Sequence, residues 1–203
     1  MNASIITLLD PAIQFFVIYP FMLKVFSKVP VGKLFGAISE AIMVAFGTAS
    51  SSATLPLTIT CCEKRGISNR VCSFVLPLGA TLNMDGTAIY QGVCAVFIAS
   101  CFGIHLTFGQ IVTIVLTATL ASIGTAGVPG AGMVMLAMVL QSVGLPVEGI
   151  ALVAGVDRIF DMGRTVLNIT GDSACSLIVS KLEEKREIKK SGYIAGSQVE
   201  AAE

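Results

Sequence analysis

The chain has 203 residues, of which 54% are hydrophobic and 13% are charged, and its formal net charge at pH 7 is zero. No Asp, Glu, Lys or Arg occurs between Thr87 and Val147, so the composition indicates a membrane protein and excludes an ordinary water-soluble domain. No basic stripe interleaved with aromatic residues is present, which excludes a nucleic-acid-binding protein, and the six cysteines lack the spacing of metal ligands.

Five apolar segments follow one another along the chain. We predict a transmembrane helix over 1–28, a helical hairpin over 31–64 that turns at its serine cluster, and a helix over 67–103 that is broken near Asp85. A second hairpin is predicted over 108–143, with its turn at Gly124–Gly132, and a helix with a polar stripe over 146–184. Residues 1–190 then form one domain, and 191–203 form a disordered cytoplasmic tail.

Loop charges orient these segments in a membrane. The loop before the first hairpin, the loop after it and the tail are basic, with Lys24, Lys28, Lys33, Lys64, Arg65, Arg70, Lys181, Lys185, Arg186, Lys189 and Lys190. The positive-inside rule places all three in the cytoplasm, and it places the loops around His105 and Glu148, which have no Lys or Arg, outside. Each hairpin must therefore enter the membrane and turn back.

The predicted fold class follows from this topology. We expect an all-α membrane protein with transmembrane helices, two opposed re-entrant helical hairpins, and an unwound helix at a site near the midplane. Non-helical backbone at that depth is tolerated only where it is buried in protein or lines a polar cavity. This architecture is typical of secondary transporters with inverted repeats.

The last segment carries the strongest functional signal. Its polar residues fall within about 100° of helical arc and so share one face: Asp157, Asp161, Arg164, Thr165, Asn168 and Asp172. Each charge facing lipid would cost roughly 2.5–3.5 kcal/mol, so this face must line an interior that holds ions or a charged solute. Arg164 suits one carboxylate, Asp161 an ammonium and Asn168 a second carboxylate. An acidic amino acid fits these groups, and Asp172 is placed for a cation.

Three other motifs indicate binding sites. Ser50–Ser52 offers hydroxyls and backbone N–H groups to an anion at a hairpin tip. Asn83 and Asp85, with carbonyls freed by unwinding near Gly86, supply hard oxygen ligands for a small cation. The glycines and the proline of Gly124–Gly132 prevent a continuous helix there and predict a mobile lid.

The residues leave other interpretations open. Each motif can be a structural turn, and the charges of the last segment can form a salt-bridge network without a ligand. An ion channel selective through Asn83 and Asp85 is a further class, although Arg164 in the same cavity opposes a pure cation pore. An intramembrane aspartyl enzyme using Asp157 and Asp161 is another, but Arg164 would keep both carboxylates ionised, so we expect no enzyme.

Four motifs resemble the carboxy-terminal half of the glutamate/aspartate sodium symporters, the dicarboxylate/amino acid:cation symporter family. They are SSSATLP (Ser50–Pro56), LPLGATLNMDGTAIYQG (Leu76–Gly92), ASIGTAGVPGAG (Ala121–Gly132) and DMGRTVLNITGD (Asp161–Asp172). They follow the family's order and spacing.

The resemblance implies a set of substrate residues. Ser51 and the backbone at Val128 and Gly132 would touch the substrate. Thr87 and Arg164 would hold its side-chain carboxylate, Asp161 with Thr165 its amino group, and Asn168 its α-carboxylate.

The resemblance also implies three sodium sites. One uses carbonyls of Gly79, Asn83 and Asn168 with the Asp172 carboxylate. A second uses carbonyls of Thr81, Ser122, Ile123 and Thr125. The third uses Asn83 and Asp85, completed by residues outside this sequence.

The function that the resemblance implies is sodium-coupled symport of aspartate, glutamate or a related dicarboxylate across the inner or plasma membrane. The domain 1–190 would be a transport domain that slides through the lipid bilayer, with sodium as coupling ion and no other cofactor. The amino-terminal scaffold, through which family members form homotrimers, is not in this sequence. Proton-coupled dicarboxylate symport, or a fragment that does not transport without its scaffold, are the alternatives.

Three positions depart from residues common in the family, and one keeps a residue that bears on the coupling ion. Ala49 and Met162 stand where many members have arginine, and Gln91 stands where animal relatives have a proton-carrying glutamate. Gln91 argues against proton and potassium coupling. Asp172 is retained, which favours sodium.

Overall fold

The computed structural model describes residues 13–27 and 29–200, and every regular element in this part of the chain is helical. The predicted all-α composition is therefore confirmed. The start of the first predicted helix, Lys28 in its basic loop and the last three residues of the predicted tail lie outside the described residues.

The elements follow the apolar segments in order. Helix α2 (Tyr19–Met22) lies between two π-helical turns, η1 (Gln14–Ile18) and η2 (Leu23–Ser27). Two helical pairs follow, α3 (Val31–Thr48) with α4 (Ser51–Glu63), and α5 (Asn69–Leu82) with α6 (Asp85–Cys101). Then come α7 (Phe108–Ile123) and α8 (Ala131–Ser142), the 3-10 turn η3 (Val147–Ile150), α9 (Ala151–Ala154) and α10 (Asp157–Glu200).

The serine cluster makes the turn between α3 and α4. Ala49 adopts the left-handed conformation that ends α3, with φ 51° and ψ 37°. Ser50 is extended, and its hydroxyl accepts the backbone N–H of Ala53 at 3.1 Å, which caps α4. The antiparallel pair α3–α4 thus presents Ser50–Ser52 at its tip.

Local chemistry also sets the other helix ends. Asn83 and Met84 have non-helical backbone angles, so α5 stops at Leu82 and α6 starts at Asp85. Thr107 and Gln110 form a capping box that starts α7. Gly130, with φ 79°, ends the loop that leads into α8.

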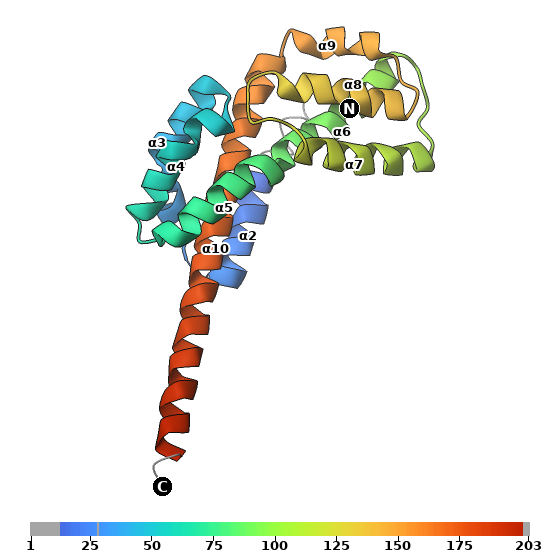
Figure 1. The fold of residues 1–203 in the computed structure, drawn as a ribbon. Helices are drawn as coiled ribbons and strands as arrows, with labels where there is room; N and C mark the ends of the chain where they lie inside the picture. The colour runs from blue at the N-terminus through green and yellow to red at the C-terminus, as the bar shows by residue number, and fades with distance from the viewer. Residues whose placement is uncertain (1–12, 28, 201–203) are drawn as a thin grey trace.

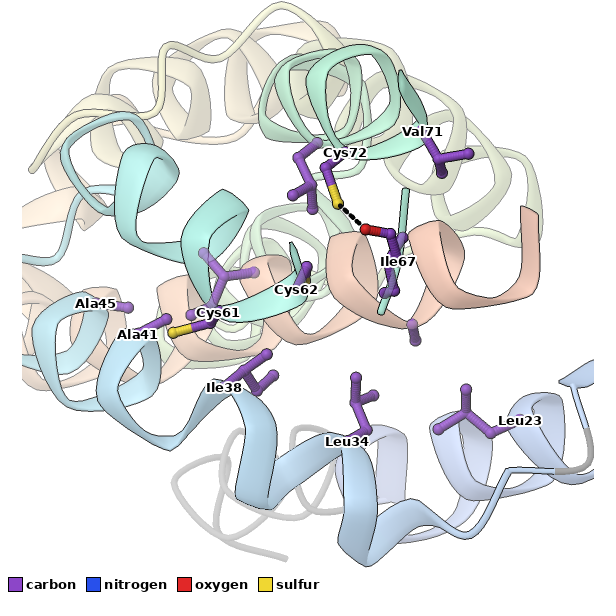
Figure 2. Packing of buried hydrophobic residues seen from close by; sticks show 13 residues of the cluster. Leu23, Leu34, Ile38, Ala41, Ala45, Cys61, Cys62, Ile67, Val71 and Cys72 are labelled. Carbon is purple, nitrogen blue, oxygen red and sulfur yellow. Dashed lines mark hydrogen bonds between the residues drawn. The ribbon is translucent and has the colours of Figure 1, made fainter. Parts of the chain in front are cut away.

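Helix α10 is the axis on which the other elements pack. It contacts α3, α4, α5 and α6, with α3–α4 on one side and α6–α9 gathered near its first turns (Figure 1). One apolar core joins Leu23, α3, α4 and α5 to α10, and Figure 2 shows Leu34 and Ile38 of α3 directed at Cys62 and Ile67. A second core joins α6, α7 and α8 to Val153. The polar face of α10 lies between these two cores.

The end of α10 differs from the sequence prediction. The helix continues through Glu200, past the other elements in Figure 1, whereas a disordered tail is predicted from residue 191. No proline follows Asp157 to interrupt the helix, and its stretch around Glu183–Lys190 is rich in helix-forming Lys and Glu. Disorder of this tail in solution stays a prediction.

The surface and hydropathy of the helices suit an apolar environment. Asn69–Cys101, which covers α5 and α6, is a 33-residue stretch long and apolar enough to cross a membrane. Gln14–Ser27, α7 and α8 are shorter apolar helices. Phe108 on α7 is 82% exposed and Val134 on α8 is 70% exposed, so these helices present apolar side chains outward.

The turn at Ala49 predicts a difference between two Ala→Gly substitutions. Among the described residues, Ala49 is the one non-glycine residue with positive φ, a conformation that costs an L-residue roughly 1–2 kcal/mol. Ala49→Gly should therefore raise the free energy of unfolding by up to about 1 kcal/mol. Ala45→Gly, inside α3, should lower it by about 1 kcal/mol. Thermal unfolding in detergent measures both, and an equal loss in the two variants would contradict the turn.

Candidate functional site

The polar face of α10 is buried in the protein. Asp157, Asp161, Arg164, Thr165, Asn168 and Asp172 are each 3–5% exposed. Ile159, on the other side of the helix, is 65% exposed. The stripe of charged residues therefore faces the interior, as its cost in lipid requires.

All eight residues expected to touch a substrate line one cavity. Ser51 comes from α4, Thr87 from α6, Val128 from the α7–α8 loop and Gly132 from α8. Asp161, Arg164, Thr165 and Asn168 come from α10, and Ala49, Met84, Thr125, Ala126 and Gly127 complete the lining. The cavity measures about 10 Å³, which is room for about one water molecule. The cavity in this structure is therefore too small for an amino acid.

Arg164 is the cation of the cavity, and it is paired internally. Its Nε donates to Oδ1 of Asp161 at 2.9 Å, and Nη2 lies 2.9 Å from the same oxygen. Nη1 lies 3.6 Å from Oδ1 of Asp157 and has no hydrogen-bond acceptor among the described residues. The guanidinium therefore keeps donor capacity for a ligand.

Tyr90 supports this ion pair from α6. The guanidinium carbon lies 4.4 Å from the centre of the Tyr90 ring, a cation–π contact. The Tyr90 hydroxyl donates to Oδ1 of Asp157 at 2.6 Å. Tyr90 thereby fixes both Arg164 and the second carboxylate. The one sequence signal for Tyr90 is its position three residues after Thr87, which places both on the same helical face.

The α7–α8 loop closes the cavity. The backbone N–H of Gly130 donates to Oδ2 of Asp161 at 2.9 Å. The carbonyl of Gly127 accepts the Ser50 hydroxyl at 2.7 Å and the Ser52 backbone N–H at 3.2 Å. The loop is thus tied both to α10 and to the tip of the α3–α4 pair.

Two glycines let the loop and α8 approach this closely. A Cβ on Gly132 would lie 2.5 Å from Nη1 of Arg164, and a Cβ on Gly127 would lie 2.7 Å from the Ser52 hydroxyl oxygen. Neither position has room for a side chain while the cavity is closed.

Asn168 fixes the start of α6. Its Oδ1 accepts the backbone N–H of Gly86 at 3.0 Å, and its Nδ2 donates to the Thr87 hydroxyl at 3.4 Å. The side chain therefore lies between the expected substrate residue Thr87 and the break between α5 and α6.

Three of the residues expected to bind sodium are neighbours in the structure. Nδ2 of Asn83 donates to Oδ1 of Asp172 at 2.9 Å, and the Asp172 carboxylate lies against Gly79, where a Cβ would collide with it. Gly79, Asn83 and Asp172 thus form one group beside Asn168. In the second expected set, Ser122 and Thr125 are buried, whereas Thr81 and Ile123 are exposed.

Asp85 has partners that sequence analysis did not identify. Its Oδ2 accepts the Tyr19 hydroxyl at 3.1 Å and also Nε2 of Gln14. Oδ1 of Asp85 and Oε1 of Gln14 have no donor among the described residues. A lone Gln or Tyr in an apolar helix gives no sequence signal for such a role. Across the described part of the chain, no group of three or more His, Cys, Asp or Glu side chains is placed to hold a metal ion.

Comparison with known proteins identifies the family. Residues 2–182 match the model of the sodium:dicarboxylate symporter family. The chain belongs to this family. Symporters are membrane proteins, so the family places the chain in a membrane and sets it apart from enzymes.

Several animal proteins are similar in sequence to this chain. The chain is 44% identical over 194 residues to the putative sodium-dependent excitatory amino acid transporter glt-4 of Caenorhabditis elegans, which covers 95% of the chain and 39% of that protein. It is 49% identical over 165 residues to human excitatory amino acid transporter 1, which covers 81% of the chain and 30% of that protein. A second Caenorhabditis elegans excitatory amino acid transporter is 55% identical over 141 residues, 69% of the chain and 28% of that protein. The chain thus spans between 28% and 39% of the length of these relatives.

The close approach of Gly132 to Arg164 predicts a loss of stability on adding one methyl group. Gly132→Ala should lower the free energy of unfolding by about 1–3 kcal/mol, because the guanidinium must leave its place beside Asp161. Gly92→Ala is the control, since a Cβ there meets no atom within 4 Å, and this helical substitution should stabilise slightly. Thermal unfolding measures both variants, and equal effects would show that α8 does not lie on Arg164.

Proposed function

We propose that this chain binds an acidic amino acid, aspartate or glutamate, together with sodium, and forms the transport domain of a longer sodium-coupled symporter of the cell membrane. The observation that carries the proposal is the single cavity lined by all eight expected substrate residues, with Arg164 inside it. Membership in the sodium:dicarboxylate symporter family supports it, as does similarity to proteins named as sodium-dependent excitatory amino acid transporters.

A ligand would enter by replacing the internal ion pair. The side-chain carboxylate of the ligand takes the place of Asp161 on Arg164, with Thr87 beside it. The planar guanidinium can bind that carboxylate through two parallel hydrogen bonds. Asp161 then accepts the ammonium group next to Thr165, and Asn168 turns its amide to the α-carboxylate. Ser51 and the backbone at Val128 and Gly132 close over the ligand.

Entry requires the α7–α8 loop to move, because the closed cavity has room for about one water molecule. Three hydrogen bonds hold the loop, from Gly130 to Asp161 and to Gly127 from Ser50 and Ser52. Each contributes about 0.5–1.5 kcal/mol, so the loop opens at a cost that ligand binding can repay. The bond to Asp161 also makes the loop sensitive to what Asp161 binds.

The balance of charge gives sodium its role. Asp85, Asp157, Asp161 and Asp172 are grouped around the α5–α6 break and α10, and Arg164 is the cation paired among them in the described structure. An acidic amino acid adds another negative charge to this interior. Cations at Asp172 and Asp85 compensate it, so sodium and substrate bind cooperatively. Asn83, Gly79 and Asn168 would complete the site at Asp172, and carbonyls of Thr81, Ser122, Ile123 and Thr125 would form a further site.

The remaining parts of the proposal concern the membrane. Residues 31–64 and 108–143 would be re-entrant hairpins, 83–84 would be the unwound centre of a transmembrane helix, and 1–190 would form the transport domain. The carboxy-terminal tail would lie in the cytoplasm. The longer protein would supply the scaffold, assemble as a homotrimer, and allow this domain to slide across the bilayer.

Arg164 is the residue whose loss should remove acidic ligands. Arg164→Ala should weaken sodium-dependent binding of labelled aspartate at least about 30-fold, because a buried charged partner is lost. Arg164→Lys, which keeps the charge and the buried pairing, should also weaken binding, since lysine lacks the fork. Arg158→Ala is the control, because Arg158 is exposed and its side chain donates a hydrogen bond to the carbonyl of Gly47, outside the cavity. Unchanged aspartate binding in Arg164→Lys and Arg164→Ala would exclude the proposed site.

Asp172 should set the sodium requirement and leave amino acid recognition intact. Asp172→Asn should raise the sodium concentration for half-maximal aspartate binding about tenfold. The reason is that the loss of one charged sodium ligand weakens sodium binding by about 1.5 kcal/mol. At saturating sodium the aspartate affinity should return toward that of the unmodified chain. Glu148→Gln, at an exposed carboxylate, is the control. Binding that follows protons with no dependence on sodium would favour a proton-coupled symporter instead.

A further inference from the structure

A second cavity lies at the basic end of the molecule. It measures about 200 Å³ and shares no residue with the first cavity. Its apolar walls come from four parts of the chain, namely the η2–α3 connection, α3, the end of α4 with the α4–α5 connection, and α10: Val29, Leu34, Ala37, Ile38, Cys62, Ile67 and Leu177. Figure 2 shows Leu34 and Ile38 facing Cys62 and Ile67 across this part of the core.

Three basic side chains line the same cavity. They are Lys33 on α3, Arg65 in the turn after α4, and Lys181 on α10. Lys33 and Arg65 are exposed residues, so we place them at the rim of the cavity rather than in its apolar walls. The Arg65 guanidinium lies close to α3, because its Nη2 is 3.9 Å from the position that a Cβ on Gly36 would occupy.

The acidic groups nearby leave this rim positive. Lys181 is paired with Glu184, one helical turn further on, at 2.7 Å. Glu63, two residues before Arg65, accepts a hydrogen bond from Asn69. No carboxylate is among the residues that line the cavity, so Lys33 and Arg65 act as the two cations that a ligand meets there.

We propose that this cavity binds an anionic phospholipid of the cytoplasmic leaflet, with its headgroup phosphate at Lys33 and Arg65 and the start of an acyl chain against Leu34, Ile38 and Ile67. Basic pockets between membrane helices on the cytoplasmic side suit acidic lipid headgroups. A phosphate alone would use the rim and leave the apolar walls in water. A lipid satisfies both.

The proposal rests on the orientation that Proposed function gives the chain, with these basic loops in the cytoplasm, and not on the substrate. Every residue that lines the second cavity belongs to the described part of the chain, and none of them lines the first cavity. Lipid binding can therefore fail while aspartate binding persists, and the reverse.

Native mass spectrometry of the detergent-solubilised chain tests the proposal. The chain is offered phosphatidylserine and phosphatidylcholine of identical acyl chains in equal amounts. We expect a one-to-one phosphatidylserine adduct retained over phosphatidylcholine by about fivefold for each of the two rim cations. The double variant Lys33→Gln, Arg65→Gln should abolish this preference.

Two further variants distinguish lipid binding in this cavity from a nonspecific attraction between the lipid and basic residues on the surface. Lys64→Gln, Arg70→Gln removes the same net charge from exposed neighbours outside the cavity and should keep the preference. Ala37→Leu fills the cavity and should reduce binding of both lipids while the helical circular dichroism stays unchanged.

Four results would overturn the proposal. They are equal retention of the two lipids, equal loss of preference in the two double variants, full competition by glycerophosphoserine, and no adduct at all. Full competition by the headgroup would show an anion site without the acyl chain. No adduct would show that the cavity does not hold a phospholipid.

Discussion

The buried pair of Arg164 and Asp161 is the interaction on which the rest of this site depends. Two charges taken out of water are tolerated only while they are paired and hydrogen-bonded, and removing one partner typically costs about 3–5 kcal/mol. The Asp161 carboxylate pairs with two nitrogens of the Arg164 guanidinium, and it also accepts a hydrogen bond from the backbone N–H of Gly130. Any ligand that takes Arg164 from Asp161 must therefore give Asp161 a new cation. An amino acid with an extra carboxylate carries both groups.

This constraint organises the surrounding helices. Tyr90 and Asp157 fix the far side of the guanidinium, and Gly132 lets α8 begin directly against it. The loop that leads into α8 is held by Asp161 and by the serine turn of α3–α4. A change at the ion pair is thereby transmitted to both loops through hydrogen bonds rather than through distant packing. In the proposed function, opening of the cavity and replacement of Asp161 by a ligand carboxylate on Arg164 are therefore parts of one event.

Much of this arrangement could be predicted, because it depends on the spacing of polar residues along a helix and on residues that interrupt a helix. The polar residues of α10 recur at helical spacing, so their common burial follows from the cost of charge in lipid. Ser50 and Gly130 mark turns by their own backbone preferences. Tyr19 and Gln14 could not be predicted as partners of Asp85, since nothing in one sequence shows which helices meet. The small volume of the cavity could not be predicted either, because the pairing of Arg164 with Asp161 depends on the position of the α7–α8 loop.

The most direct test of this account follows the guanidinium itself. Solid-state NMR of the chain in bilayers can measure dipolar coupling between ¹⁵N-labelled arginine side chains and the ¹³C-labelled side-chain carboxylate of added aspartate. With sodium present, we predict a coupling that corresponds to direct bidentate contact, with N···O distances of about 2.7–2.9 Å, and no coupling when sodium is replaced by potassium. An aspartate that binds in sodium without any arginine coupling, while Arg164 keeps its contact to Asp161, would contradict the exchange of partners at the centre of this site.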